Sequence, residues 1–213
     1  LYNHIGPALV GGDQRVLVTE MAGRASVEMK SKELGYDITG DAERVTHIVE
    51  TVKDLESKGW TFEAADASFE LILMGSDESQ SRFEVESWRT IVEQDASGDV
   101  RTEATVKVRA NGERMISTAE GNGPVNALDK ALRSAVTSLH PELEPLELID
   151  YKVRILEKSD ADTSGTASVT RVLVSTSDGK REWTTLGVHE NVVAASWRAL
   201  EDALTYGLMR SQA

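Results

Sequence analysis

Residues 120–132 read Glu-Gly-Asn-Gly-Pro-Val-Asn-Ala-Leu-Asp-Lys-Ala-Leu, and a similar stretch returns about 68 residues later. The second stretch, residues 190–200, reads Glu-Asn-Val-Val-Ala-Ala-Ser-Trp-Arg-Ala-Leu. Each begins with turn residues and continues with apolar residues at helical spacing. A strand-to-helix turn that occurs twice indicates an internal repeat. The repeat predicts two related units that meet at a pseudo-twofold seam.

Both units have the same predicted order, in which two strands joined by a loose polar turn are followed by a hairpin, a third strand and a helix. The predicted strands of the two units are 83–93, 103–110 and 114–119, and then 148–157, 167–176 and 183–188. Helices follow over 124–139 and 191–208, with Pro124 at the favourable first position. Asn111-Gly112 and Asp178-Gly179, which lie 67 residues apart, are the predicted hairpin turns.

This order predicts an α+β fold with two βββα units related by a pseudo-twofold. A three-stranded sheet with one helix buries only one face well, so the two units are expected to pack together. We place unit one at 82–141 and unit two at 146–211, within a domain that spans 82–213.

Residues 1–75 predict a smaller and mostly helical subdomain. Helices are expected over 25–34, from an Asp41 cap to Gly59, and over 63–74. Residues 1–20 are predicted to be irregular apart from a short strand at 15–19. The polar, Ser-rich segment 75–81 is the expected domain boundary.

The composition excludes several classes of function. A net charge of −13 leaves no basic stripe for a nucleic acid. The absence of cysteine removes disulfides and thiolate chemistry and fits a cytoplasmic location. No apolar run approaches the roughly 18 residues that a membrane span needs. Because Leu1 is not an initiator methionine, we expect the chain to be a fragment of a larger protein.

No arrangement of residues predicts catalysis within this chain. None of the four histidines, His4, His47, His140 and His189, lies in an HxH or HExxH pattern. The sequence also has no GxSxG, phosphate-binding loop or dinucleotide-binding glycine motif. We therefore expect no catalytic residue, no metal site and no cofactor in this chain, and no activity from it alone.

Two short motifs are candidates for binding. Free N–H groups at the helix start after Gly123 attract a carboxylate, although the same residues also fit an ordinary strand-to-helix turn. Asp150 can hold an ammonium group and Tyr151 can line an apolar pocket, although both also fit a plain strand. Together the two motifs would describe an amino-acid pocket at the seam.

The same residues resemble the C-terminal part of the bacterial (R)-citramalate synthases, which belong with the 2-isopropylmalate and homocitrate synthases. The resemblance lies in residues 121–132, 150–154, 187–191 and 195–197, and in the linker-like residues 4–11 and 23–24. It covers nearly the whole chain. Met29 departs from the pattern, because relatives often carry a tyrosine there, and a methionine cannot donate a proton.

The resemblance implies a linker subdomain followed by a regulatory domain that dimerises and binds an end-product amino acid. For citramalate synthases this effector is isoleucine, and a leucine-sensing domain of an isopropylmalate synthase or a ligand-free dimerisation module are the alternatives. The family's catalytic TIM barrel, which carries the divalent metal site and condenses acetyl-CoA with a 2-oxo acid, is absent from this chain. The expected effector-binding residues are Gly123, Pro124, Val125, Asn126, Leu148, Asp150, Tyr151, Ile155, Glu190 and Asn191.

Overall fold

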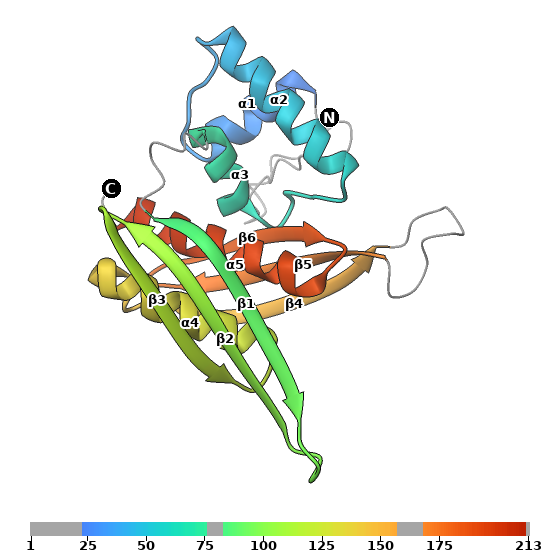
Figure 1. The fold of residues 1–213 in the computed structure, drawn as a ribbon. Helices are drawn as coiled ribbons and strands as arrows, with labels where there is room; N and C mark the ends of the chain where they lie inside the picture. Colours follow the sequence, from blue (N-terminus) through green and yellow to red (C-terminus); the bar gives the residue numbers. More distant parts are fainter. Residues whose placement is uncertain (1–22, 76–82, 157–167, 212–213) are drawn as a thin grey trace.

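The computed structural model describes residues 23–75, 83–156 and 168–211. These residues form three helices followed by two units, each of which has three antiparallel strands and one long helix (Figure 1). The α+β prediction and the repeat are therefore confirmed. The predicted strand at 15–19, the turn at 159–165 and almost all of the boundary at 75–81 lie outside the described residues.

Unit one forms one sheet with the strand order β1-β2-β3, and the helix α4 packs on it. Its elements are β1 (Glu84–Gln94), β2 (Val100–Ala110), β3 (Glu113–Gly121) and α4 (Pro124–Leu139). Asn111 and Gly112 have φ angles of 51° and 80°, so the predicted tight hairpin is present. Leu128, Leu132 and Ala135 are buried as predicted, whereas Val125 and Leu139 are only partly buried.

Unit two repeats this arrangement with the strand order β4-β5-β6 and the helix α5. Its elements are β4 (Glu147–Leu156), β5 (Val169–Ser177), β6 (Glu182–His189) and α5 (Val192–Arg210). The hairpin differs from the prediction. Asp178 N–H donates to Arg181 O at 3.1 Å, so the two central residues are Gly179-Lys180 rather than Asp178-Gly179. Gly179 supplies the positive φ, 81°, at the first central position.

A single apolar core joins the two units. It contains buried residues of β2, α4, β5 and α5, and it includes the indoles of Trp88 and Trp197. These indoles stack with their ring centroids 5.5 Å apart, so β1 of unit one contacts α5 of unit two directly. The prediction that the two units bury their faces together is confirmed.

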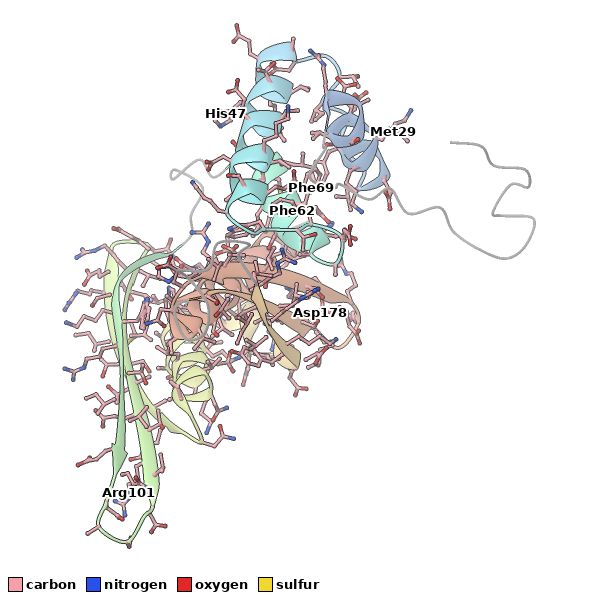
Figure 2. All side chains as sticks on the ribbon, turned by 90° about the vertical axis from the view of Figure 1, so that its right-hand side faces the viewer. Met29, His47, Phe62, Phe69, Arg101 and Asp178 are labelled. Atoms are coloured by element: carbon pink, nitrogen blue, oxygen red, sulfur yellow. The ribbon has the colours of Figure 1, made fainter. Side chains whose placement is uncertain are left out.

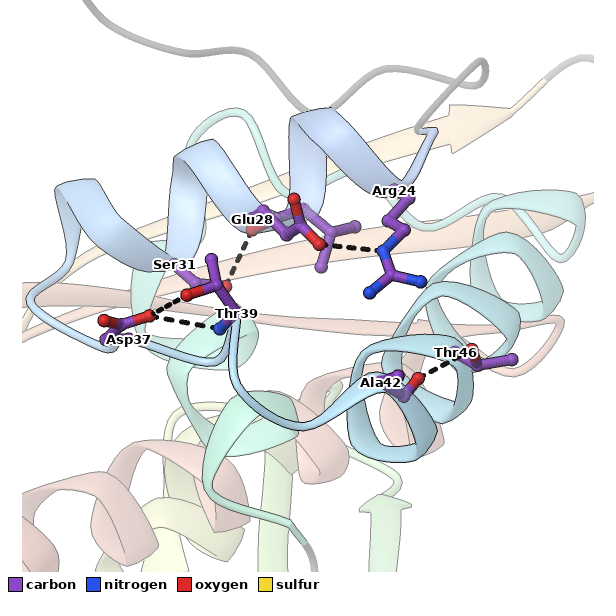
Figure 3. Close-up of polar contacts among 8 residues, drawn as sticks. Arg24, Glu28, Ser31, Asp37, Thr39, Ala42 and Thr46 are labelled. Atoms are coloured by element: carbon purple, nitrogen blue, oxygen red, sulfur yellow. Dashed lines mark hydrogen bonds and ion pairs between the residues drawn. The ribbon is translucent and has the colours of Figure 1, made fainter.

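The first three helices have a core of their own. These helices are α1 (Arg24–Glu33), α2 (Ala42–Ser57) and α3 (Asp66–Met74). Asp41 caps α2 by accepting from Arg44 N at 2.9 Å, and Asp37 accepts from Thr39 in the preceding turn (Figure 3). Phe62 and Phe69 fill the centre of this helical unit, whereas Met29 and His47 point away from it (Figure 2). The third helix begins at Asp66, three residues later than predicted.

The helical unit covers the face of the second sheet that points away from α5. Ser68 of α3 accepts a hydrogen bond from Leu186 N at 2.8 Å, and Arg171 Nε donates to Gly59 O at 2.8 Å. In Figure 1, α3 accordingly lies next to β6. The corresponding face of the first sheet carries exposed polar side chains such as Arg89 and Arg109. The two units therefore share one fold but have different surroundings.

Candidate functional site

A β-bulge in β4 places three of the predicted site residues on one face of the strand. Leu148 pairs with Thr176 and Tyr151 pairs with Val174, and the register shifts between Leu148 and Asp150. In a regular strand, residues three apart point to opposite faces. The bulge adds one residue, Ile149, so Leu148 and Tyr151 point the same way, and Ile155 follows on that face.

The face that carries these residues is the one on which α5 packs, but α5 covers β5 and β6 rather than all of β4. The side chains at the far end of β4 are therefore exposed, with 45% of Val153 and 62% of Ile155 accessible to solvent. We call Leu148, Tyr151, Val153 and Ile155 the β4 stripe. The stripe is partly buried at Tyr151, against α5, and is exposed toward Ile155, which is the geometry that a site with one apolar wall would have.

Tyr151 is held by the first turn of α5. Its hydroxyl lies 2.7 Å from Ser196 Oγ, and Ser196 in turn donates to Val192 O at 2.7 Å. Because the single proton of Ser196 is used in the bond to Val192, Tyr151 is the donor to Ser196. The phenol oxygen therefore keeps its lone pairs for a further donor.

Unit one has the same bulge with a different outcome. The register of β1 shifts between Val85 and Ser87, and Trp88 takes the position that Tyr151 has in unit two. Trp88 stacks on Trp197, so an indole fills the space in unit one. Val92 is the counterpart of Ile155 and is 56% exposed. The repeat thus places an indole in unit one where unit two has a phenol, while the far ends of β1 and β4 are both exposed.

The start of α4 lacks a side-chain cap from its N-cap residue, Gly123. Among the described residues, the only side-chain hydrogen bond within residues 121–126 is the one from Asn122 N to Asn126 Oδ1, at 3.3 Å. Pro124 begins the helix, and Val125 is partly buried against the main core. Free N–H groups in the first turn remain compatible with a carboxylate ligand.

Asp150 Oδ1 accepts from the backbone N–H of Tyr151 at 3.0 Å, but its side chain does not lie beside the Tyr151 phenol. Asp150 pairs with Ser175 on the opposite face of β4, where its carboxylate accepts from the Lys152 ammonium. This hydrogen bond is the main reason why the pKa of Asp150 lies below its usual value. The arrangement gives no support to the prediction that Asp150 holds a ligand ammonium beside Tyr151.

The turn before α5 uses Asn191 as a cap. Its Oδ1 accepts from Val193 N at 2.8 Å and from Ala194 N at 3.2 Å, while the neighbouring Glu190 is exposed. Asn191 and Gly123 occupy equivalent positions at the two helix starts, so one helix is capped internally and the other is not. Among the described residues, no hydrogen bond joins residues 123–126 to the β4 stripe.

Two residues of this site were missed by the sequence reasoning, Val153 and Ser196. Val153 was recognised as an alternating strand residue, and its exposure depends on how far α5 extends over β4. Ser196 lies on the buried side of α5, and only the fold shows that it meets Tyr151.

Within the parts of the chain that the structure describes, no group of three or more His, Cys, Asp and Glu side chains is arranged to hold a metal. None of the helices described there is long and apolar enough to cross a membrane.

The geometry defines a class of protein, namely a duplicated βββα module with exposed apolar side chains along β4 of its second unit. A profile of the LeuA allosteric (dimerisation) domain matches residues 63–208, and the chain belongs to this family. The matched part begins before α3 and ends within α5.

The chain is also similar to curated enzymes along nearly its whole length. The (R)-citramalate synthase of Streptomyces coelicolor is 60% identical over 213 residues, which are 99% of this chain and 39% of that protein. The (R)-citramalate synthase of Aquifex aeolicus is 39% identical over 99% of this chain and 40% of that protein. The 2-isopropylmalate synthase of Acetivibrio thermocellus is 28% identical over 95% of this chain and 37% of that protein. The chain thus spans about two fifths of the length of these relatives.

Proposed function

We propose that this chain is the regulatory and dimerisation part of an acyltransferase of the citramalate synthase type, which acts in isoleucine biosynthesis. In this proposal, a separate TIM barrel condenses acetyl-CoA with pyruvate and holds the divalent metal. The proposal is supported by the membership of the LeuA allosteric (dimerisation) domain family and by the 60% identity to a citramalate synthase. The chain alone is expected to form no citramalate.

The effector proposed for this part is isoleucine, and the β4 stripe is its proposed binding surface. The observation that carries this proposal is the bulge, which aligns Leu148, Tyr151 and Ile155 on one partly open face. A branched aliphatic side chain fits an apolar wall of this kind, and its burial is worth about 1–3 kcal/mol. The phenol oxygen of Tyr151 can accept from the ligand ammonium, and the uncapped start of α4 is the candidate for its carboxylate.

The proposed assembly is a homodimer. Val92 on β1 and Val153 and Ile155 on β4 are exposed in a single copy, although each lies on the apolar face of its sheet. A second copy that covers these side chains would remove apolar surface from water.

Calorimetric titration of the 213-residue chain with isoleucine, leucine and valine tests the proposed effector. We expect isoleucine to bind and the other two to bind about tenfold or more weakly, because displacement of one methyl group changes affinity by about 1–3 kcal/mol. Tighter binding of leucine would replace this proposal with a leucine-sensing domain of a 2-isopropylmalate synthase. No heat with any of the three, from a dimeric sample, would leave a ligand-free dimerisation module.

A further inference from the structure

The helix α3 lies between the two apolar cores of the molecule. Ala67 and Leu71 pack in the core of the duplicated units, whereas Phe69 and Leu73 pack in the core of the helical unit. A helix that is buried on two sides moves with both of its neighbours or separates from one of them. The position of α3 therefore fixes how the helical unit sits on unit two.

One buried carboxylate of α3 joins both sides. The side chain of Glu70 is only 5% exposed, and its Oε1 accepts from the Tyr206 hydroxyl at 2.9 Å. Its Oε2 accepts from Arg210 Nη2 at 2.7 Å and from the Tyr36 hydroxyl at 3.1 Å. Tyr206 and Arg210 belong to α5, whereas Tyr36 lies between α1 and α2. We call these four residues the Glu70 cluster.

The partners of Glu70 hold its carboxylate in place, because a buried carboxylate raises the free energy of the folded chain unless it is fully paired. Arg210 Nε also donates to the Tyr206 oxygen at 3.0 Å, and its guanidinium lies 5.2 Å from the centre of the Tyr206 ring. Burial raises the pKa of Tyr206 to about 12, and burial and the nearby Glu70 also raise the pKa of Tyr36. Both hydroxyls therefore keep their protons and remain donors at physiological pH.

The other end of α5 holds the proposed site. Ser196 in its first turns contacts Tyr151 of the β4 stripe, and Tyr206 lies ten residues further along the same helix, which corresponds to about 15 Å. The remaining hydrogen bonds that tie the helical unit to unit two in the described residues reach β5 and β6 instead, through Arg171 and Leu186. The Glu70 cluster is thus the polar link that is specific to α5.

We propose that Glu70 couples α5 to the helical unit, so that a displacement of α5 at the β4 stripe is passed through α3 to α1 and α2. The ligand that triggers this displacement rests on the proposed function, but the coupling itself does not need a ligand. Inhibition of a distant catalytic part requires only that the effector favours one arrangement of coupled elements.

Hydrogen exchange of the 213-residue chain tests the coupling, with Glu70→Gln as the variant. Glu86→Gln is the control, because Glu86 is also a paired carboxylate, bound to Arg109 and Arg114, but lies on β1 away from α3. Without ligand, we expect Glu70→Gln to speed exchange about tenfold or more both at 24–57 and at the end of α5. Equal exchange in the two variants would overturn the coupling.

The arm with isoleucine separates the coupling from the proposed function. If isoleucine binds, the unchanged chain should gain protection at both α5 and 24–57, and Glu70→Gln should bind it within about twofold but lose the change at 24–57. A change at 24–57 that persists in Glu70→Gln would overturn the coupling and leave the function intact. If isoleucine does not bind, the proposed function fails, and the ligand-free comparison still decides the coupling.

Should Glu70→Gln fail to fold, Tyr206→Phe removes one donor and should give a smaller increase in exchange at the same two segments.

Discussion

Ile155 contributes the most exposed apolar side chain of β4, so it should matter for binding and little for folding. We expect Ile155→Ser to weaken isoleucine binding about tenfold or more, which is the loss of roughly one apolar contact. Arg154→Ser is the control, because Arg154 is also exposed and points to the other face of the strand. Titration calorimetry with both variants checks this. An equal effect of the two substitutions would place the ligand elsewhere.

Asp202 of α5 gives a prediction about pH. Burial raises its pKa to about 7, against the opposing effect of Arg198 and with a smaller contribution from Glu201. The folded chain binds the Asp202 proton more tightly than the unfolded chain does, so the contribution of Asp202 to stability is greatest below its unfolded pKa of 3.8. This contribution is lost as the pH rises through the folded pKa of about 7. Asp202→Asn should therefore be more stable than the parent at pH 8, by on the order of 1–3 kcal/mol, and should gain less at pH 5.

Urea unfolding at the two pH values measures this effect. Asp54→Asn is the control, because Asp54 also faces a cation four residues away but is exposed on α2. A stability difference between Asp202→Asn and the parent that does not change with pH would contradict the assignment.

At the scale of elements, β6 and α5 pack so closely that only glycine fits at position 187. A Cβ there would lie 1.9 Å from Ala195 O and 3.0 Å from Ala199 N, both of which are backbone atoms of α5. We expect Gly187→Ala to destabilise the chain by about 3 kcal/mol or more, because backbone cannot yield as a flexible side chain does. Gly123→Ala, which meets nothing within 4 Å, is the control. Thermal unfolding of both variants decides the point.

The elements themselves could be predicted from the sequence because their signals are local. Alternation predicted the strands at 103–110 and 148–157, and the turn signals placed the other four strands around them. Asp41 predicted the start of α2, and Pro124 predicted the start of α4. The bulge at Ile149 could not be predicted from alternation, because it depends on the pairing of β4 with β5. The hairpin at Asp178 was misplaced by one residue, since Asp-Gly fits a type I′ turn while the chain puts Gly179 first.

The candidate site stays a prediction. Tyr151 was proposed from the sequence itself and Leu148 and Ile155 from the resemblance, and the bulge explains why the three side chains share a face. Asp150 was selected as the neighbour of Tyr151, but adjacent strand residues point to opposite faces, and it pairs with Lys152. The Glu70 cluster joins residues far apart in the sequence, so no local pattern indicates it.

At the scale of the whole molecule, the two copies of the unit have different surroundings. Trp88 stacks on Trp197 in unit one where Tyr151 bonds to Ser196 in unit two, and the helical unit contacts β5 and β6 of the second sheet. Under the proposed function, unit two is the one that binds the effector, and unit one serves as its packing partner.

Asymmetry between the units predicts one ligand per chain rather than two. Calorimetry of the parent should give a stoichiometry near one isoleucine per chain. The variant Trp88→Tyr replaces the larger indole of unit one with a phenol, and it tests whether this indole prevents a second isoleucine from binding. A parent stoichiometry of two would contradict the assigned roles. The variant is expected to keep the tight site, since Trp88 lies outside the β4 stripe.

The most direct test of the central claim is a methyl and amide NMR titration of the 213-residue chain with isoleucine. The account predicts saturable shifts that are largest at the methyl groups of Val153 and Ile155 and at the amides of the first turns of α5. Shifts that are absent, or that are largest on the outward face of the first sheet around Arg89, would contradict it.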